Sequence, residues 1–383
     1  MKKTFRLFGI FTMILLSCLV LAVCNNSSGG GEDEDSSDNR DGLSEATAFL
    51  VNNAEELGYV GRGSANPEGY KNWDFNKNYK QTADIDLSGI ANWTPIGNDR
   101  SFEGTYDGDG YAIKNLKIDT MEYSAGLFAS ATNCFSNSIK NIALIDCDIT
   151  GDYYIGGIVG RGSIIIENCY VTGIIRGISV IGGIVGYYFG GGGIKNCYTT
   201  CDVINSGTSV SSSDGGFGGI VGTSEYNNVA HTGVEGLGII TNCFATGIVT
   251  GRNSIGGIAG NSDGTIRNCM ALNKTVTSLE NLDITIIKRR IGKIIGINYD
   301  TATNNYGRSD MGIGYTGSRH DDIVDGDPVT KTQAESSTWW TTAAWDAVSP
   351  WDWTTVWNLP SGGKLPTLKV FDGKQTQNPV IIN

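Results

Sequence analysis

The chain has 383 residues and a formal net charge of −12, with 40% hydrophobic and 18% charged residues. This much apolar material is sufficient for a large core and excludes a wholly disordered protein, while the excess of acidic residues argues against a nucleic acid partner. Glycine occurs 54 times, roughly twice the ordinary usage, and proline only seven times, so collagen and proline-rich linkers are excluded and many tight turns are expected.

Residues 1–24 have the layout of a secretory signal: three basic residues precede an apolar stretch, and the sequence turns polar directly after it. The end of this segment, residues 21–24 (LAVC), resembles a bacterial lipoprotein lipobox, which implies cleavage before Cys24 and attachment of a lipid to that cysteine. Two alternatives stay open. A transmembrane anchor would have about the same length, and a second lipobox frame ends at Cys18.

Residues 25–42 contain no large apolar side chain, and they carry six acidic residues against one arginine. Like charges repel one another, so we expect an extended, solvated tether. An acidic run directly after a lipidated cysteine resembles the surface-export signals of some outer-membrane lipoproteins. The expected location is therefore the cell envelope, lipid-anchored, at the outer membrane or cell surface, with the inner membrane as the alternative.

Residues 43–122 are predicted to form an amino-terminal cap and the first coils of a repeat. Asn53, followed by Glu56 three residues later, is typical of the start of a short helix. We expect this helix to close the first coil, because an open end of a repeat stack exposes strand edges and core.

Residues 123–300 contain the strongest signal in the chain, an internal repeat. A pentapeptide, GGIVG or GGIAG, is followed in each copy by a second element that begins with isoleucine and contains Asn-Cys. The shortest repeat interval, 26 residues from Gly156 to Gly182, suits one coil of three short strands joined by turns. The pentapeptides occupy residues 156–160, 182–186, 218–222 and 256–260, with degenerate copies at 125–129 and 292–296, and the second elements occupy 166–170, 194–198, 240–244 and 266–270.

Each unit is too short to fold alone, so we expect an all-β fold in which the units stack as a right-handed parallel β-helix with a cap at each end. The pentapeptide glycines allow either a positive φ or a close approach of adjacent coils. The equivalent isoleucines are predicted to form an inward column: Ile158, Ile184, Ile220 and Ile258. The equivalent asparagines are predicted at a left-handed corner, with their amides hydrogen-bonded along the stack: Asn168, Asn196, Asn242 and Asn268.

These elements resemble the GLUG-type repeats of secreted and surface bacterial proteins. The likeness extends to a lead-in over residues 83–116 and a closing segment over 351–368. The resemblance implies a β-helical surface domain and no shared catalytic residue. Some large metalloproteases carry such repeats beside a catalytic domain, but the HExxH motif does not occur in this chain.

Residues 301–383 are predicted to form carboxy-terminal coils and a tryptophan-rich cap. Six of the eight tryptophans lie in this part, and we expect them to cover the last coil. The alternative is a platform on which sugars stack. The six are Trp339, Trp340, Trp345, Trp351, Trp353 and Trp357.

Four cysteines occupy equivalent repeat positions and are predicted to form an inward stack of free thiols, because parallel in-register pairs seldom have disulfide geometry. They are Cys169, Cys197, Cys243 and Cys269. If any disulfide forms, Cys134 with Cys147 is the expected pair.

Three other motifs point to no ligand. Asp107 and Asp109 are predicted to form a tight turn rather than a calcium loop. The glycine pattern at 312–317 formally matches a dinucleotide fingerprint but is predicted to be a loop, because no strand precedes it. His231 and His320 are too few for a three-histidine metal site. No metal and no cofactor are therefore expected.

A carbohydrate-cleaving β-helix would need an exposed cluster of acids and bases on adjacent coils, whereas the predicted outward column is mixed in charge, as in a solvated face. We therefore expect a surface-displayed, lipid-anchored adhesin-like or scaffold protein without catalytic activity; a polysaccharide-binding or polysaccharide-cleaving protein is the alternative. The expected partners are the membrane, through the lipid, and an extracellular protein or glycan that contacts inserted loops such as 206–215 and 224–238. A monomer is expected. The outward column is Glu167, Lys195, Thr241 and Arg267.

Overall fold

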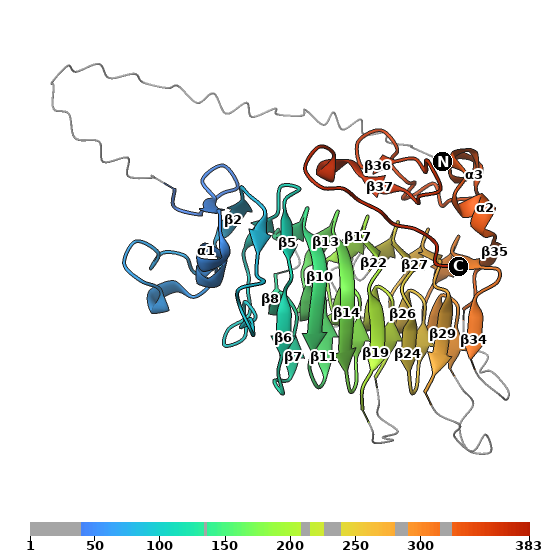
Figure 1. The fold of residues 1–383 in the computed structure, drawn as a ribbon, viewed down its shortest axis with the longest axis horizontal. Coiled ribbons are helices and arrows are strands. Elements are labelled where there is room, and N and C mark those ends of the chain that lie inside the picture. Colours follow the sequence, from blue (N-terminus) through green and yellow to red (C-terminus); the bar gives the residue numbers. More distant parts are fainter. Residues whose placement is uncertain (1–39, 134–135, 208–214, 226–238, 280–289, 315–323) are drawn as a thin grey trace, which may run out of the picture. The chain divides into compact units, whose positions relative to one another are not determined.

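The structure is a computed structural model that describes residues 40–133, 136–207, 215–225, 239–279, 290–314 and 324–383, all within one compact unit. Short strands follow one another around each rung and pair in parallel with the equivalent strands of the neighbouring rungs (Figure 1). This is the parallel β-helix that the repeat predicts. Among the described strand pairs, one is antiparallel, β36 (Trp357–Asn358) with β37 (Thr367–Leu368).

Four parallel sheets run along the stack. The first contains β1 (Phe49–Val51), β2 (Asn78–Gln81), β4 (Thr105–Asp107), β9 (Ser138–Lys140), β13 (Ile165–Glu167), β17 (Gly193–Lys195), β22 (Ile239–Thr241), β27 (Ile266–Arg267) and β32 (Ala302–Thr303). The second contains β3 (Ile85–Asp86), β5 (Ala112–Lys114), β6 (Lys117–Asp119), β10 (Ala143–Thr150), β14 (Tyr170–Gly177), β18 (Tyr198–Thr199), β19 (Asp202–Asn205), β23 (Phe244–Ala245), β24 (Val249–Gly251), β28 (Met270–Ala271), β29 (Thr275–Ser278), β33 (Tyr306–Arg308), β34 (Gly312–Gly314) and β35 (Asp327–Val329).

The third sheet contains β7 (Ser124–Ala125), β11 (Tyr154–Gly156), β15 (Ile181–Gly182), β20 (Phe217–Gly218), β25 (Ile255–Gly256) and β30 (Ile291–Gly292). The fourth contains β8 (Phe128–Thr132), β12 (Val159–Ser163), β16 (Val185–Phe189), β21 (Val221–Glu225), β26 (Ala259–Ser262) and β31 (Ile295–Asn298). The helices are α1 (Ala54–Tyr59), α2 (Lys331–Ala334) and α3 (Ser337–Thr342), with 3-10 turns at η1 (Gly63–Ala65) and η2 (Lys369–Phe371).

One rung contains five short strands, so the prediction of three strands per coil was wrong. The rung that begins at Ile181 passes through β15, β16, β17, β18 and β19. Left-handed residues lie at two of the corners of this rung, with φ of 98° at Gly192 and 54° at Asn196, whereas the breaks at residues 183–184 and 200–201 contain no residue with a positive φ. The break between β18 and β19 recurs in other rungs, as β5/β6, β23/β24, β28/β29 and β33/β34, whereas β10 and β14 each continue through it as one strand.

The glycines of the pentapeptide are required by close approach between rungs. A Cβ at Gly182 would lie 2.1 Å from the carbonyl oxygen of Val185, and a Cβ at Gly186 would lie 2.5 Å from the amide nitrogen of Ile155 in the preceding rung. Neither glycine has a left-handed φ. Of the two roles that the sequence allowed, the structure therefore confirms close approach and not positive φ.

The recurring asparagines form the predicted ladder. Asn168, Asn196 and Asn242 all have φ of 54°, and Asn268 has φ of 53°. Two of these amides donate to the preceding asparagine of the set: Asn196 Nδ2 lies 3.2 Å from Asn168 Oδ1, and Asn242 Nδ2 lies 3.4 Å from Asn196 Oδ1. Asn268 departs from the prediction, because its amide donates to the carbonyls of Asp346 and Ser349 instead of to Asn242. The ladder therefore fixes the corner and the register of successive rungs together.

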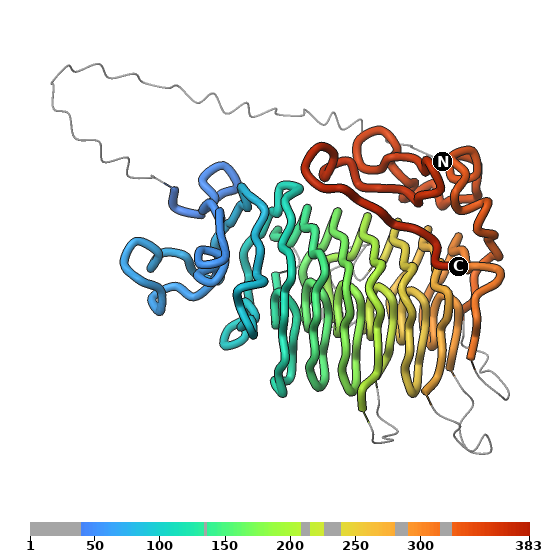
Figure 2. The backbone as a smooth tube through the Cα atoms, viewed as in Figure 1, coloured from blue at the N-terminus to red at the C-terminus, as the bar shows by residue number. Residues whose placement is uncertain are grey.

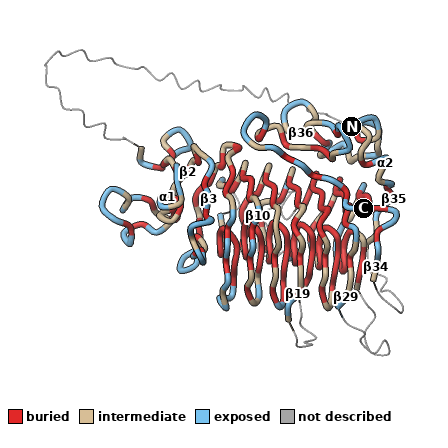
Figure 3. The backbone as a smooth tube through the Cα atoms, viewed as in Figure 1, coloured by how far each residue is buried: buried red, intermediate tan, exposed pale blue. Residues whose placement is uncertain are grey.

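Most of the backbone of the stack belongs to buried residues (Figure 3). Aligned apolar columns fill the interior. The predicted isoleucine column is fully buried, as is the cysteine column that follows the asparagine corner. All six described cysteines are buried free thiols, and Cys134 lies outside the described residues. At the amino-terminal end, Asn53 caps α1 through a bond from the amide of Glu56, as predicted, and Leu57 of this helix joins the same core.

The carboxy-terminal segment runs back along the outside of the stack, and we call residues 330–383 the strap (Figure 2). It first follows the asparagine corners in reverse order. Asn268 Nδ2 donates to the carbonyl of Ser349 at 2.6 Å, and Asn242 Nδ2 donates to the carbonyl of Pro350 at 3.3 Å. The indole of Trp357 donates to Asn196 Oδ1 at 3.4 Å.

The strap then reaches the early rungs. Lys374 contacts both the carbonyl oxygen and the carboxylate of Asp109, and Gln375 Nε2 donates to Asp84 Oδ1 at 2.5 Å. The last residues return toward later rungs, where Arg308 donates to the carbonyl of Ile382 at 2.6 Å.

Candidate binding surface

The predicted outward column is less solvated than the sequence suggested. Lys195 and Glu167 of adjacent rungs form an ion pair at 2.7 Å. Thr241 is only 8% exposed, and the Arg267 side chain lies 3.7 Å from the carboxylate of Asp346 in the strap. The expectation of a freely solvated face is therefore wrong at its far end, because the strap covers it.

The strap tryptophans are largely buried, as a cap requires, but the surface that they cover differs from the predicted one. Trp340, Trp351 and Trp357 are at most 3% exposed. Trp357 packs against Tyr198 and Phe244 in the middle of the stack, with ring centroids 6.4 and 5.9 Å apart. The tryptophans thus cover the side of several rungs and not only the last one. The outer column beneath the strap includes Tyr170, Tyr198, Phe244, Met270 and Tyr306.

The other motifs have structural explanations. The amide of Asp109 donates to Asp107 Oδ1 at 2.8 Å, which confirms the tight turn. In the described part of the chain, no three His, Cys, Asp or Glu side chains come together as metal ligands. The glycine pattern begins in a strand, since β34 pairs with β29 and aligns Gly312 with Thr275; the prediction of a loop was wrong at residues 312–314.

Several predicted features lie outside the described residues. These are Cys18 and Cys24, the tether up to residue 39, His231, His320, Gly317 and most of the two inserted loops, 208–214 and 226–238. No helix within the described ranges is long and apolar enough to cross a membrane.

A row of aromatic side chains lies on the outside of the third and fourth sheets, and sequence reasoning missed it. We call it the aromatic strip: Tyr123, Tyr153, Tyr154, Tyr187 and Phe189. The rings form a continuous chain in which neighbouring centroids lie 4.7 to 5.6 Å apart. Tyr123 is 52% exposed and Tyr153 is 47% exposed, so one end of the strip is open to solvent.

Two strands and the corner between them position the rings of Tyr154, Tyr187 and Phe189. Tyr154 begins β11, directly before the buried Ile155, and therefore points outward. Tyr187 and Phe189 alternate with the buried Tyr188 on β16 of the next rung. The tight glycine corner between the third and fourth sheets brings the two sets together, and the rings of Tyr154 and Tyr187 stack at 4.7 Å.

Two charged side chains accompany the rings. The guanidinium of Arg161 lies 5.9 Å from the ring centroid of Tyr154 and 5.4 Å from that of Phe189, within cation–π distance. Its Nε atom is buried without a hydrogen-bond partner. The hydroxyl of Tyr187 donates to Glu225 Oε2 at 2.5 Å. The strip therefore combines ring surface with one cation and one anion.

The phenols of Tyr154 and Tyr187 stay neutral near physiological pH. Partial burial, together with the hydrogen bond from Tyr123, raises the pKa of Tyr154 to about 12. Burial and the hydrogen bond to Glu225 also raise the pKa of Tyr187. These hydroxyls are therefore available as hydrogen-bonding groups and not as anions.

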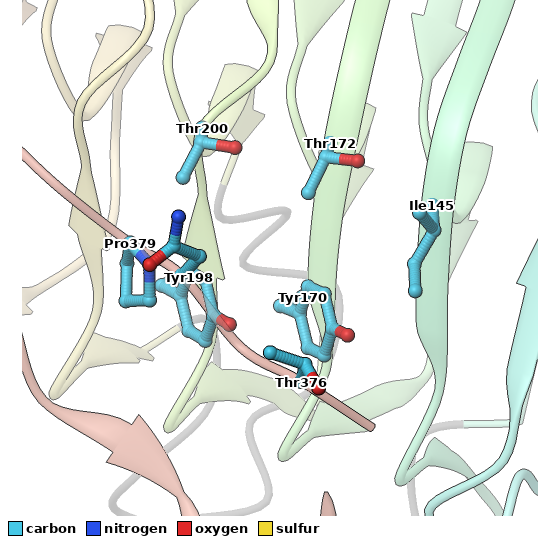
Figure 4. A pocket seen from close by; sticks show the side chains of 8 residues that line it. Ile145, Tyr170, Thr172, Tyr198, Thr200, Thr376 and Pro379 are labelled. Atoms are coloured by element: carbon cyan, nitrogen blue, oxygen red, sulfur yellow. The ribbon is translucent and has the colours of Figure 1, made fainter.

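A small crevice of about 110 Å³ lies between the second sheet and the strap (Figure 4). The rings of Tyr170 and Tyr198 stack in parallel at 4.9 Å along its wall, and the Tyr198 hydroxyl donates to Gln377 Oε1 at 3.1 Å. The Tyr170 hydroxyl is buried without a partner. The crevice is small and none of the described side chains that line it is charged, so it does not by itself indicate a ligand.

Comparison with known proteins supports the repeat assignment. Two segments, residues 151–176 and 251–277, match the GLUG motif. Halomucin from Haloquadratum walsbyi is 32% identical over 217 residues, which is 49% of this chain and 2% of halomucin, so the chain spans a very small part of that protein. The chain therefore carries GLUG repeats, as its two sequence elements suggested.

A solved structure shares the fold. The crystal structure of a "putative immunoglobulin A1 protease" from Bacteroides ovatus superposes with a TM-score of 0.61 and 20% identity, over 85% of this chain and 94% of that one. At this identity the likeness concerns the fold alone.

Proposed function

We propose that this protein is a surface-displayed binding protein, adhesin-like or scaffolding and without catalytic activity, held to the cell envelope by a lipid on Cys24. The aromatic strip is the observation that carries the proposal. Exposed rings are costly to leave in water, and Tyr and Arg are enriched at recognition surfaces. The β-helix holds these side chains on a rigid sheet, which limits the entropy lost on binding.

The charged column on the first sheet favours a structural role over a catalytic one. Glu167 is engaged by Lys195, and Arg267 is engaged by the strap. Cleavage of a polysaccharide would require a pair of carboxylates, or an acid beside a base, that is free to reach a glycosidic bond.

The binding role can be tested with an array of extracellular glycans and matrix proteins. We expect the wild-type protein to bind at least one class and the Tyr153→Ala/Tyr187→Ala variant to bind that class about tenfold more weakly. Incubation with a panel of polysaccharides tests the enzymatic alternative, because new reducing ends or unsaturated products would contradict a non-catalytic role.

The anchor is tested separately by metabolic labelling with a palmitate analogue. We expect label on the wild-type protein and on Cys18→Ala, and none on Cys24→Ala. If the label is lost in Cys18→Ala and kept in Cys24→Ala, the lipid is attached to Cys18. Protease accessibility of intact cells then distinguishes display at the surface from an inward-facing location.

A further inference from the structure

The aromatic strip extends along the stack over consecutive rungs. β7, β11 with β12, β16 and β21 belong to four successive rungs. Tyr123 lies directly before β7, and the later three rungs carry Tyr154, Tyr187 and Glu225. At a strand spacing of about 4.8 Å, the row is about 14 Å long. A surface of this form suits an extended polymer that lies parallel to the stack.

Hydroxyl groups and rings alternate along this row. The hydroxyls of Tyr123 and Tyr154 lie 3.2 Å apart, the rings of Tyr154 and Tyr187 stack, and the Tyr187 hydroxyl meets Glu225. A sugar chain has the complementary pattern, because each ring has an apolar C–H face that packs on an aromatic side chain and an edge of hydroxyls that both donate and accept hydrogen bonds.

The charges of the strip favour an uncharged ligand. Arg161 and Glu225 contribute one charge of each sign, and both can bond to hydroxyl groups. The chain as a whole has a net charge of −12, so an acidic polysaccharide would be repelled.

We infer that the aromatic strip binds a neutral, hydroxyl-rich polysaccharide whose chain lies along the stack. The half-exposed rings of Tyr123 and Tyr153 pack against sugar faces, and Arg161, Glu225 and the phenol hydroxyls bond to sugar hydroxyls. This inference rests on the proposed binding function and names the class of ligand for it.

The test is affinity electrophoresis of the purified protein in gels that contain a neutral polysaccharide (a linear β-glucan, a mannan or a xylan) or an acidic one (alginate or polygalacturonate). At least one neutral polymer is expected to retard the wild-type protein, with little change between low and high salt. The Tyr153→Ala/Tyr187→Ala variant is expected to bind about tenfold more weakly, and Glu225→Gln several-fold more weakly.

Tyr59→Ala is the matched control. The hydroxyl of Tyr59 donates to Glu55 at 2.5 Å and its ring packs on Tyr70, so the variant removes the same chemistry from α1, away from the strip. It should bind as the wild type does. Circular dichroism and thermal melting of every variant establish that the fold is retained.

The outcomes separate the two proposals. Neutral-glycan binding that persists in the double variant would overturn the assignment to the strip. Retardation by the acidic polymers alone would overturn the neutral class. If a matrix protein binds through the strip and no glycan does, the glycan inference fails while the binding function stands. If the array and the gels give no binding at all, both fail.

Discussion

The side-chain amide of Asn196 donates to the side-chain oxygen of Asn168 at 3.2 Å, and both residues have the same left-handed φ of 54°. Each asparagine thus does two things: it allows a corner that most residues avoid, and it links two rungs. The two contributions can be separated by substitution.

Asn196→Ala is expected to lower the free energy of unfolding by about 3 kcal/mol, through the cost of a left-handed alanine and the lost hydrogen bonds to its neighbours. Asn196→Gly keeps the corner and loses only the hydrogen bonds, so about 2 kcal/mol is expected. Urea denaturation measures both values. Equal losses of unfolding free energy in the two variants would show that the left-handed conformation of residue 196 has no energetic cost for alanine.

Gly182→Ala is expected to destabilise the stack by about 3 kcal/mol, because the added methyl would lie 2.1 Å from the Val185 carbonyl oxygen and only a backbone shift can relieve the contact. Gly89→Ala is the control: nothing lies within 4 Å of its added Cβ, and the change should be within about 0.5 kcal/mol. A tolerated Gly182→Ala substitution would refute the close-approach explanation.

Trp357→Ala is expected to release part of the strap, at a cost of about 3 to 5 kcal/mol for a fully buried tryptophan. Hydrogen exchange should increase in the strap and over Tyr198, while the amides of the inner isoleucine column keep their protection. Val348→Ala, at a side chain that is 76% exposed in the same strap, should leave exchange unchanged.

Attachment of the strap to the early rungs is expected to weaken in acid through Asp84. Burial alone would raise the pKa of this carboxyl, but hydrogen bonds from Ala112, Lys114 and Gln375 outweigh burial and lower the pKa. Its stabilising contribution is therefore complete above the unfolded pKa of about 3.9 and is lost as the pH falls through the lower folded pKa.

The measurement for this contribution is the stability difference between the wild-type protein and Asp84→Asn as a function of pH. A stability difference near neutral pH is expected, which begins to decrease below about pH 4 and continues to decrease as the pH falls through the lower folded pKa. Asp99→Asn, at an exposed carboxylate, provides the control. A difference that stays constant down to pH 2 would contradict the assignment.

The inner thiols are expected to be unreactive in the native protein. Burial raises the pKa of Cys147 to about 12 and that of Cys169, Cys197 and Cys243 well above the ordinary value, so little thiolate forms near pH 8. Alkylation with iodoacetamide followed by peptide mapping should label these cysteines only after unfolding in denaturant. Rapid labelling of Cys197 in the native state would show that the rungs open locally.

The stack could be derived from sequence because its determinants are local and repeated. The same glycines, isoleucine and asparagine recur in each copy, so their roles are seen several times over. The contact between Trp357 and Asn196 has no such signal, since it joins a repeat to a single-copy segment 161 residues away. The path of the strap therefore could not be predicted, although the burial of its tryptophans could.

The aromatic strip was missed for a related reason. Tyr154 and Tyr187 are outward-facing residues of different strands, and only the angle of the glycine corner decides whether their rings meet. The alternation of buried and outward residues around Ile155 and Tyr188 predicts that the side chains of Tyr154 and Tyr187 face outward. It does not predict the distance between these two rings. Tyrosine at outward positions beside successive pentapeptides is the signal that could have indicated the strip.

The strap also changes how the stack should unfold. A rod of repeats held only by adjacent units can lose its terminal units one at a time, because each unit depends on its neighbours alone. Here Lys374 and Gln375 hold positions 265 and 291 residues earlier in the chain. Contacts between residues so far apart in the sequence raise the contact order, and folding cannot be completed until the last residues of the chain are available. In the folded protein, the same contacts join both ends of the rod, so we expect the rod to unfold in one cooperative transition.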